Sequence, residues 1–396
     1  MHPTSHRRAA PDAVVAGHIS LDLFPELPGP VAYEPGRLTV VGPALISTGG
    51  SVSNTGLALH RLGVPVRLVA KVGDDLFGRA LLEALAQFES DLGAEIRVSA
   101  GEVTSYTIAI SPPGVDRTFL HCPGANLTFC ADDVRDEVLD GPRVFHFGYP
   151  PLMREMYLAD GEQLRRLFER VHAAGPATSL DLCAVDPESE AGAVDWQAVL
   201  SNALAFVDVF APSIEELLFM LDRPAHAALQ ASRGIGAFVD ASRLAALGDR
   251  LLDMGVAVVA IKLGDQGLYL RTSSDTARIG AFCDRLGLSA QAWTDREVLA
   301  PCFAARTVVG TTGSGDATIA GLLAALLRGE DPVGAATGAT AVGACSVEAV
   351  DPASSVPLWP QVAARLAGGW TRLPLDIDLG DNVSVERSPT GTLTLR

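Results

Sequence analysis

The chain alternates short apolar runs with segments whose apolar residues recur at helical spacing, and this alternation constrains the fold more than any other feature. Residues 12–17 read as a buried strand, and Leu57, Leu59 and Leu62 in the next glycine-led segment suit a helix. The same alternation continues to the apolar run 256–264. Strands that alternate with helices of this length form βαβ units. We therefore predict an α/β protein with a mostly parallel, doubly wound sheet.

Two regions depart from the alternation. Residues 104–124 read as two strands joined by a Pro-Gly-Asp turn, and with residues 38–48 they predict a small antiparallel sheet beside the main one. This sheet is either a lid over a site or an extra edge hairpin. Residues 271–300 show poor periodicity and predict an exposed insertion, while residues 382–395 predict a terminal hairpin.

Composition excludes several classes of function. The chain has 396 residues, 48% of them hydrophobic, and its net charge is 30 − 47 = −17. This charge repels nucleic acids and anionic membranes, so we expect neither as a partner. Six cysteines without a CxxC pair indicate reduced thiols rather than disulfides or a zinc site. The chain shows no secretory signal and no apolar run of about 18 residues, so we expect a cytoplasmic protein.

The stretch VVGTTGSGDATIAG, residues 308–321, places its glycines immediately before a helical pattern that starts near Gly315 or Asp316. Gly313 and Gly315 allow the backbone to approach a bulky anion, and the first N–H groups of a helix have no internal partners. The stretch is therefore either a phosphate cradle with a base beside it or a turn with a helix-favouring acid. It lacks the Gly-Lys-Ser/Thr ending of a P-loop.

A second glycine pair, Gly49 and Gly50, also leads into a helix, and Asn54 lies on the first turn. Asn54 can donate and accept hydrogen bonds, as a polyhydroxylated ligand requires. Asp22 follows the first strand, at the edge where open α/β sheets bind ligands. Each feature taken alone also fits an ordinary turn or loop.

Glu216 has two readings. With Ser213 it forms the capping-box pattern at the start of an apolar helix. It can also orient water on a magnesium ion that bridges nucleotide phosphates.

Residues 48–78 and 310–321 together resemble the ribokinase-like carbohydrate kinase family, often called PfkB. The pieces GHISLD, DRTFLHCPGAN, PSIEEL and IKLGDQGLYL match in order, so the resemblance spans roughly residues 12–365. It implies a three-layer α/β/α sandwich with a mostly parallel central sheet and a small β-sheet lid. The implied kinase domain covers residues 12–370, with the lid from about 29–48 and 102–123. Residues 371–396 then form a hairpin-like extension.

The resemblance implies transfer of the γ-phosphoryl group of ATP to a hydroxymethyl group, with Mg²⁺ as the metal. Asp316 resembles the general base of the family. The implied anion hole consists of Gly313, Ser314, Gly315 and Asp316. The implied sugar-binding residues are Asp22, Gly49, Gly50 and Asn54. The implied nucleotide-binding residues are Lys262, Gly264, Gly267 and, on the adenine side, the segment from Gly338 to Cys345. Glu216 falls on the family glutamate linked to magnesium.

Some positions depart from the family pattern. Gly310 stands where the family has an aspartate, which argues against a family-style potassium site. Ser213 replaces an asparagine, and this weakens the inference of magnesium binding at Glu216. Ser51 offers no cation where phosphofructokinase-like members often have lysine, so an unphosphorylated acceptor is favoured.

The leading hypothesis is an ATP-dependent kinase of an unphosphorylated sugar or sugar-like alcohol. A nucleoside kinase is the second, with Phe24 or Phe119 as a platform for the base. The third is a catalytically silent sugar-binding regulatory protein, although such a protein has no need of Asp316 as a base. The lid sheet can pair across a homodimer, as in many family members, or the chain can stay monomeric.

Overall fold

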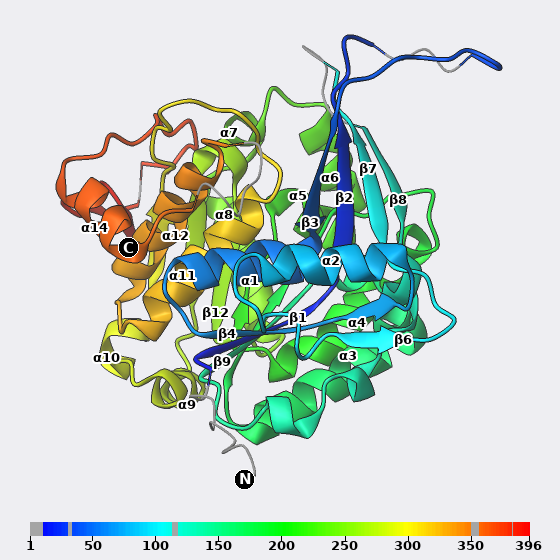
Figure 1. Ribbon diagram of the computed structural model, residues 1–396. Helices are drawn as coiled ribbons and strands as arrows, with labels where there is room; N and C mark the ends of the chain where they lie inside the picture. The colour runs from blue at the N-terminus through cyan, green and yellow to red at the C-terminus, as the bar shows by residue number, and fades with distance from the viewer. Residues whose placement is uncertain (1–10, 31–33, 113–117, 350–355, 382) are drawn as a thin grey trace.

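A ten-stranded sheet forms the centre of the described structure (Figure 1). This computed structural model describes residues 11–30, 34–112, 118–349, 356–381 and 383–396. In spatial order the strands are β15 (Val385–Arg387), β16 (Leu393–Leu395), β14 (Glu297–Ala300), β13 (Leu268–Thr272), β12 (Val258–Lys262), β11 (Val209–Phe210), β10 (Ala177–Asp181), β9 (Val144–Gly148), β1 (Ala13–Gly17) and β4 (Val66–Val69). The six strands from β12 to β4 pair in parallel, and the four beyond β12 pair antiparallel. The predicted mostly parallel α/β sheet is confirmed.

Helices cover both faces of this sheet, which gives three layers. Side chains alternate between the faces: Ala13 and Val15 enter one core, whereas Val14 and Phe145 enter the other. The first core lies under α1 (Gly50–Arg61), α2 (Leu76–Ala86), α9 (Thr276–Leu286), α11 (Ser314–Leu327), α12 (Pro332–Ser346) and α14 (Trp359–Ala367). The second lies under α3 (Arg154–Ala174), α4 (Trp196–Ala203), α5 (Ile214–Leu221) and α8 (Ala241–Asp253).

A separate four-stranded sheet stands beside the main one, and we call it the lid sheet (Figure 1). Its strands, in spatial order, are β3 (Ala44–Gly49), β2 (Ser20–Pro25), β7 (Tyr106–Ile110) and β8 (Thr118–Cys122). The expectation of a purely antiparallel sheet was wrong, because β2 joins it and runs parallel to β7. The predicted strand 38–48 begins only at Ala44, after Pro43, which has no N–H for a strand ladder. The turn expected at residues 113–116 lies outside the described residues.

The expectation of an exposed insertion at residues 271–300 was wrong. The segment contributes β13, β14, α9 and the short helix α10 (Ala290–Trp293). Ile279, Phe282 and Trp293 are buried in the first core. The apolar residues of α9 recur at helical spacing, but the charged residues and glycine between them obscure the pattern in the sequence.

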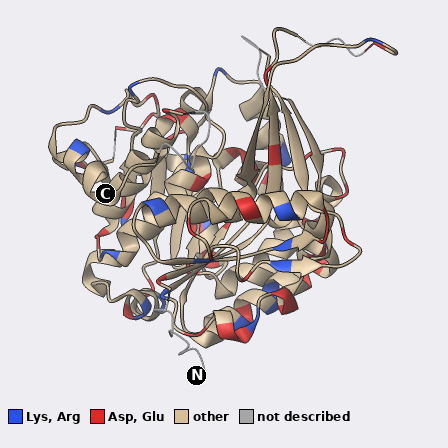
Figure 2. Cartoon of the chain, in the orientation of Figure 1, with Lys and Arg blue, Asp and Glu red and all other residues tan. Residues whose placement is uncertain are grey.

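The other short strands, β5 (Lys71–Gly73) and β6 (Arg97–Ser99), pair with each other. The other short α-helices are α6 (Arg223–Gln230) and α7 (Ile235–Phe238). Among the described residues, no helix is both long and apolar enough to cross a membrane. All six cysteines are free, and Cys183, Cys283 and Cys345 are buried. Acidic and basic residues intermingle on the helices, as in the pairs that Arg165 makes with Glu162 and Glu169 (Figure 2).

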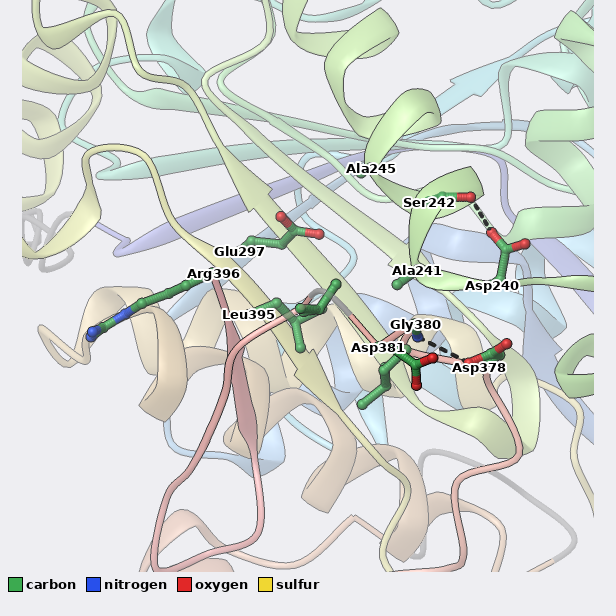
Figure 3. A pocket seen from close by; sticks show the side chains of 12 residues that line it. Asp240, Ala241, Ser242, Ala245, Glu297, Asp378, Gly380, Asp381, Leu395 and Arg396 are labelled. Atoms are coloured by element: carbon green, nitrogen blue, oxygen red, sulfur yellow. Dashed lines mark hydrogen bonds between the residues drawn. The ribbon is translucent and has the colours of Figure 1, made fainter.

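The C-terminal residues extend the large sheet. Strands β15 and β16 form a hairpin, and β16 pairs with β14. A cavity of about 370 Å³ lies between this hairpin and α8, lined by acidic residues that include Asp240, Asp378 and Asp381 (Figure 3). Asp240 accepts a hydrogen bond from the Ser242 hydroxyl, and Asp378 accepts one from the Gly380 N–H. Local turn and cap contacts therefore account for two of these three carboxylates.

Candidate active site

Two cavities meet at the N-terminus of α11. One has a volume of about 310 Å³ and the other of about 470 Å³. Lys262, Gly264, Ser314 and Gly315 line both of them. The preceding Gly313 has φ 74°, a left-handed conformation that favours glycine. The N-terminal N–H groups of α11 and the positive end of its dipole therefore lie where the two cavities join, which suits an anion.

Asp316 lies on the first turn of α11 and lines the smaller cavity. Its carboxylate is buried and accepts hydrogen bonds from Tyr149 Oη at 2.7 Å, Asn54 Nδ2 at 2.9 Å and Thr55 Oγ1 at 3.3 Å. Burial raises the pKa of Asp316 above its ordinary value, although the three hydrogen bonds and Lys262 partly oppose this rise. A buried carboxylate with a raised pKa and a cavity in front of it is equipped to accept a proton.

Sequence reasoning missed Tyr149 and Thr55 as partners of Asp316. Tyr149 follows β9 directly, so its position at the carboxyl end of a parallel strand was the available signal. Its φ of 69° places a non-glycine residue in the left-handed region. Burial and the nearby carboxylates of Asp316 and Asp181 raise the pKa of Tyr149. Its hydroxyl therefore stays protonated and donates a hydrogen bond to Asp316.

The lid sheet and the start of α1 bring Asp22, Gly49 and Gly50 together. Asp22 lies on β2, not in the loop expected after the first strand, and it accepts a hydrogen bond from the Ser20 hydroxyl at 2.7 Å. A Cβ atom on Gly49 would lie 2.0 Å from Asp22 Oδ2, and one on Gly50 would lie 2.5 Å from His18 Nδ1. The two glycines therefore allow this close approach, whereas Asn54 points to Asp316.

Lys262 ends β12 and forms an ion pair with Asp181, which ends β10, with 2.6 Å between Nζ and Oδ1. Both side chains are buried. Burial alone would lower the pKa of Lys262, but the carboxylates of Asp181, Glu216 and Asp316 raise it above its ordinary value. Lys262 is therefore a permanent positive charge at the junction of the two cavities.

Glu216 lines the same cavity as Asp316, and its capping box with Ser213 is present. Glu216 Oε2 accepts from the Ser213 N–H at 2.7 Å, and the Ser213 hydroxyl accepts from the Glu216 N–H at 3.2 Å. No cluster of three metal-binding side chains occurs among the described residues. However, Asp181 Oδ2, which is buried near Glu216 in this cavity, has no protein partner within the described ranges. These carboxylates fit Mg²⁺ bound mainly through phosphates and water.

The larger cavity has a mainly apolar lining, which includes Phe303, Ala344, Val347 and Leu373. Gly264 and Gly267 border it, as the sequence predicted. Gly338 and Cys345 do not line it: Gly338 packs against Trp359 and α11, and Cys345 Sγ lies 3.7 Å from Arg365. Other residues of α12, Thr340 and Gly343 among them, line the cavity instead, because a helix turns successive side chains to different sides.

Alternating rings and guanidinium groups support one wall of the larger cavity. Phe303 and Trp370 stack with 4.6 Å between ring centres. The guanidinium of Arg372 lies 3.9 Å from the centre of the Phe303 ring, and that of Arg365 lies 3.5 Å from the centre of Trp370. Trp370 Nε1 also donates to the carbonyl of Ala304 at 2.7 Å. Nothing in the sequence motifs indicated this wall, because its residues are far apart in the chain.

Comparisons with known proteins agree with this arrangement. The family described as pfkB family carbohydrate kinase matches residues 11–359. An uncharacterised sugar kinase of Archaeoglobus fulgidus is 27% identical over 277 residues, which cover 69% of this chain and 88% of that protein. Ribokinase of Arabidopsis thaliana, solved with ribose and ATP, has a TM-score of 0.66 at 19% identity, covering 90% of this chain and 98% of that one. A nucleoside kinase of Methanocaldococcus jannaschii has a TM-score of 0.64 at 17% identity, covering 90% and 98%.

The chain belongs to the pfkB family of carbohydrate kinases, and its fold is the ribokinase-like three-layer sandwich. The protein is therefore of the class of ATP-dependent sugar kinases.

Proposed function

We propose that the protein transfers the γ-phosphoryl group of ATP to a hydroxymethyl group of an unphosphorylated sugar or sugar-like alcohol. The position of Asp316 carries the proposal. Its buried carboxylate lines the smaller cavity, on the first turn of the helix whose N-terminus borders both cavities. Asp316 accepts the proton of the attacking hydroxyl, and the backbone from Gly313 to Asp316 stabilises the charge on the phosphoryl group.

The larger cavity is the site that we assign to the nucleotide. Its apolar lining beside Phe303 suits an adenine ring, and Gly264 and Gly267 leave room for the rest of the nucleotide. Lys262 and the N-terminus of α11 direct the phosphates toward Asp316. Phosphoryl transfer depends mainly on positioning and charge stabilisation, which these groups provide.

Magnesium is the metal that this donor set fits. Glu216 and Asp181 would hold the ion through water or directly, and the ion would offset negative charge on the phosphates. Gly310 supplies no carboxylate, so we do not assign a potassium site to this loop.

The acceptor binds on the lid side of Asp316, where Asp22, Gly49 and Gly50 come together. Asn54 donates to the Asp316 carboxylate and so orients it toward the acceptor. Among the described residues, Lys262 is the only lysine or arginine that lines either cavity, and it is paired with Asp181. An acceptor that already carries a phosphate would need further cations, so an uncharged acceptor fits better.

A nucleoside acceptor is the second candidate, because Phe119 on β8 is 50% exposed and offers a ring face on the lid sheet. A silent sugar-binding protein is the third, but it would not need a buried base beside an anion-binding helix terminus.

A coupled assay of ADP release tests the proposal over a panel of unphosphorylated sugars, cyclic polyols, nucleosides and sugar phosphates, with MgATP as donor. We expect acceptor-dependent ADP release with one sugar or polyol and identification of a phosphomonoester product by ³¹P NMR. Turnover confined to nucleosides would favour the second candidate. ATP binding without turnover on any acceptor would contradict the proposal.

A further inference from the structure

A row of polar side chains crosses the lid sheet toward the acceptor side. In the strand register Asp22 of β2 lies opposite Thr107 of β7, and Thr107 lies opposite His121 of β8. Thr107 Oγ1 lies 3.0 Å from His121 Nδ1, which is hydrogen-bond distance. The three side chains therefore form one polar row across the sheet.

Thr107 satisfies one ring nitrogen of His121. Its hydroxyl pairs with Nδ1, so Nε2 is the ring nitrogen that is left for a ligand. Nε2 of His121 is buried and has no partner among the residues that the structure describes.

His18 lies against this histidine. Its side chain, which follows β1, is 2% exposed, and neither ring nitrogen has a partner in the described part of the chain. Its ring centre lies 5.3 Å from that of His121 and 6.0 Å from that of Tyr149, whose hydroxyl contacts Asp316. His18 therefore lies between His121 of the lid sheet and Tyr149, which donates a hydrogen bond to Asp316.

Both rings are neutral in this setting. Burial, with a smaller contribution from His121, lowers the pKa of His18 to about 3, and burial also lowers the pKa of His121. A neutral His18 offers one donor and one acceptor, and His121 offers its remaining ring nitrogen, Nε2. Buried polar atoms without partners are costly, and three ring nitrogens here have none within the described residues, which points to a ligand that supplies their hydrogen bonds.

We propose that His18 and His121 are specificity-determining residues that bind neighbouring hydroxyl groups of the acceptor, next to the hydroxyl that is phosphorylated. This inference rests on the proposed function and names the groups that its acceptor must carry. Hydroxyl groups suit these rings because a hydroxyl can donate to an unprotonated ring nitrogen or accept from a ring N–H, so each histidine can bind its own hydroxyl. A phosphate finds no positive charge on two neutral rings.

Monodeoxy analogues of the best acceptor from the panel test this proposal with His18→Ala and His121→Ala. We expect each variant to lose about 10- to 100-fold in kcat/KM on the parent acceptor, with the KM for ATP unchanged. On the analogue that lacks the hydroxyl bound by that histidine, the variant and the wild type should have equal kcat/KM. A variant with a general structural defect would instead have a lower kcat/KM than the wild type on every analogue.

His226→Ala is the matched control, because His226 on α6 lines neither cavity and contacts Phe219. Its kcat/KM should equal that of the wild type on every acceptor. Should His18→Ala not fold, as judged by thermal melting, His18→Asn and His121→Ala carry the test. If each histidine variant lost kcat/KM by the same factor on the parent acceptor and on all analogues, the inference would be overturned. Turnover by the wild type in the same experiment would still support the proposed function. Absence of wild-type turnover on every acceptor would overturn both.

Discussion

At the scale of single residues, opposing effects set the properties of Asp316. Burial raises its pKa, whereas hydrogen bonds from Tyr149, Asn54 and Thr55 and the charge of Lys262 hold it down. The charged form must be the active one if Asp316 accepts a proton, so activity falls as the pH drops below this raised pKa. The acid limb of the pH profile of kcat/KM therefore reports on the surroundings of Asp316.

Tyr149→Phe removes the shortest of these hydrogen bonds and should move that acid limb to higher pH. In the wild type this hydrogen bond stabilises the charged carboxylate, so its loss in the variant raises the pKa of Asp316 further. We expect about a 3- to 30-fold lower kcat/KM near neutral pH and a smaller loss at alkaline pH, measured by ADP release from pH 5 to 9. An acid limb at the wild-type position, with the same loss at every pH, would contradict this role of Tyr149.

At this scale, motifs predicted some site residues and missed others. Asp316, Lys262 and Gly264 lie in recognisable local patterns, and they do line the cavities. Tyr149 belongs to no pattern, and the piece GHISLD gives no sign of what surrounds His18, because these surroundings are created when the lid sheet folds over the end of the main sheet. A sequence shows that a residue follows a strand, but it does not show what packs against it.

At the scale of elements, the proposed function requires that the start of α11 leave space for a phosphoryl group. A Cβ atom on Gly315 would lie 3.5 Å from Lys262 Nζ, which is ordinary van der Waals contact, and the residue has no left-handed backbone. The folded protein therefore tolerates alanine there, and alanine is the better helix former. The added methyl group would nevertheless lie at the junction of the two cavities.

Gly315→Ala should therefore fold with at least wild-type stability and lose about 100-fold or more in kcat. Thermal melting and ADP release on the same sample measure the two effects. Gly280→Ala, a substitution in α9 where an added Cβ meets no atom within 4 Å, is the matched control and should keep full activity. Wild-type turnover of Gly315→Ala would mean that the phosphoryl group does not pass this residue.

Elements also show where periodicity is informative. Strands such as β1, β9 and β12 were predicted because each is a short, mainly apolar run that is buried along its length. Helix α9 was missed because Arg278, Gly280 and Asp284 stand between its buried residues in the sequence and obscure their helical spacing. The parallel pairing of β2 with β7 could not be predicted either, because it joins residues more than 80 positions apart.

At the scale of the whole molecule, the larger cavity, which we assign to the nucleotide, depends on residues beyond the family match, which ends at residue 359. Leu373 lines this cavity, and Trp370 and Arg372 enclose the Phe303 ring. Thr392 of the C-terminal segment in turn accepts a hydrogen bond from Arg372 Nη2 at 2.6 Å. The C-terminal residues thus hold one wall of the site as well as an edge of the sheet. The homodimer expected through the lid sheet stays a prediction.

Trp370→Ala should raise the KM for ATP about tenfold, because Phe303 loses its stacking partner and the Ala304 carbonyl loses the shorter of its two hydrogen bonds. The KM for the acceptor should stay within about twofold, since Trp370 lies on the nucleotide side. Initial rates with each substrate varied in turn separate the two constants. A rise in the acceptor KM with an unchanged KM for ATP would contradict this assignment of the cavities.

The most direct test of the central claim compares the wild type with Asp316→Asn. We measure acceptor-dependent ADP release and, by calorimetry, the binding of ATP to each protein. If Asp316 is the base, kcat should fall about 10²- to 10⁴-fold while the Kd for ATP changes by less than about threefold. Asparagine keeps the size of the side chain, so the fold should persist. A variant with wild-type turnover would contradict the claim that Asp316 takes the proton from the acceptor.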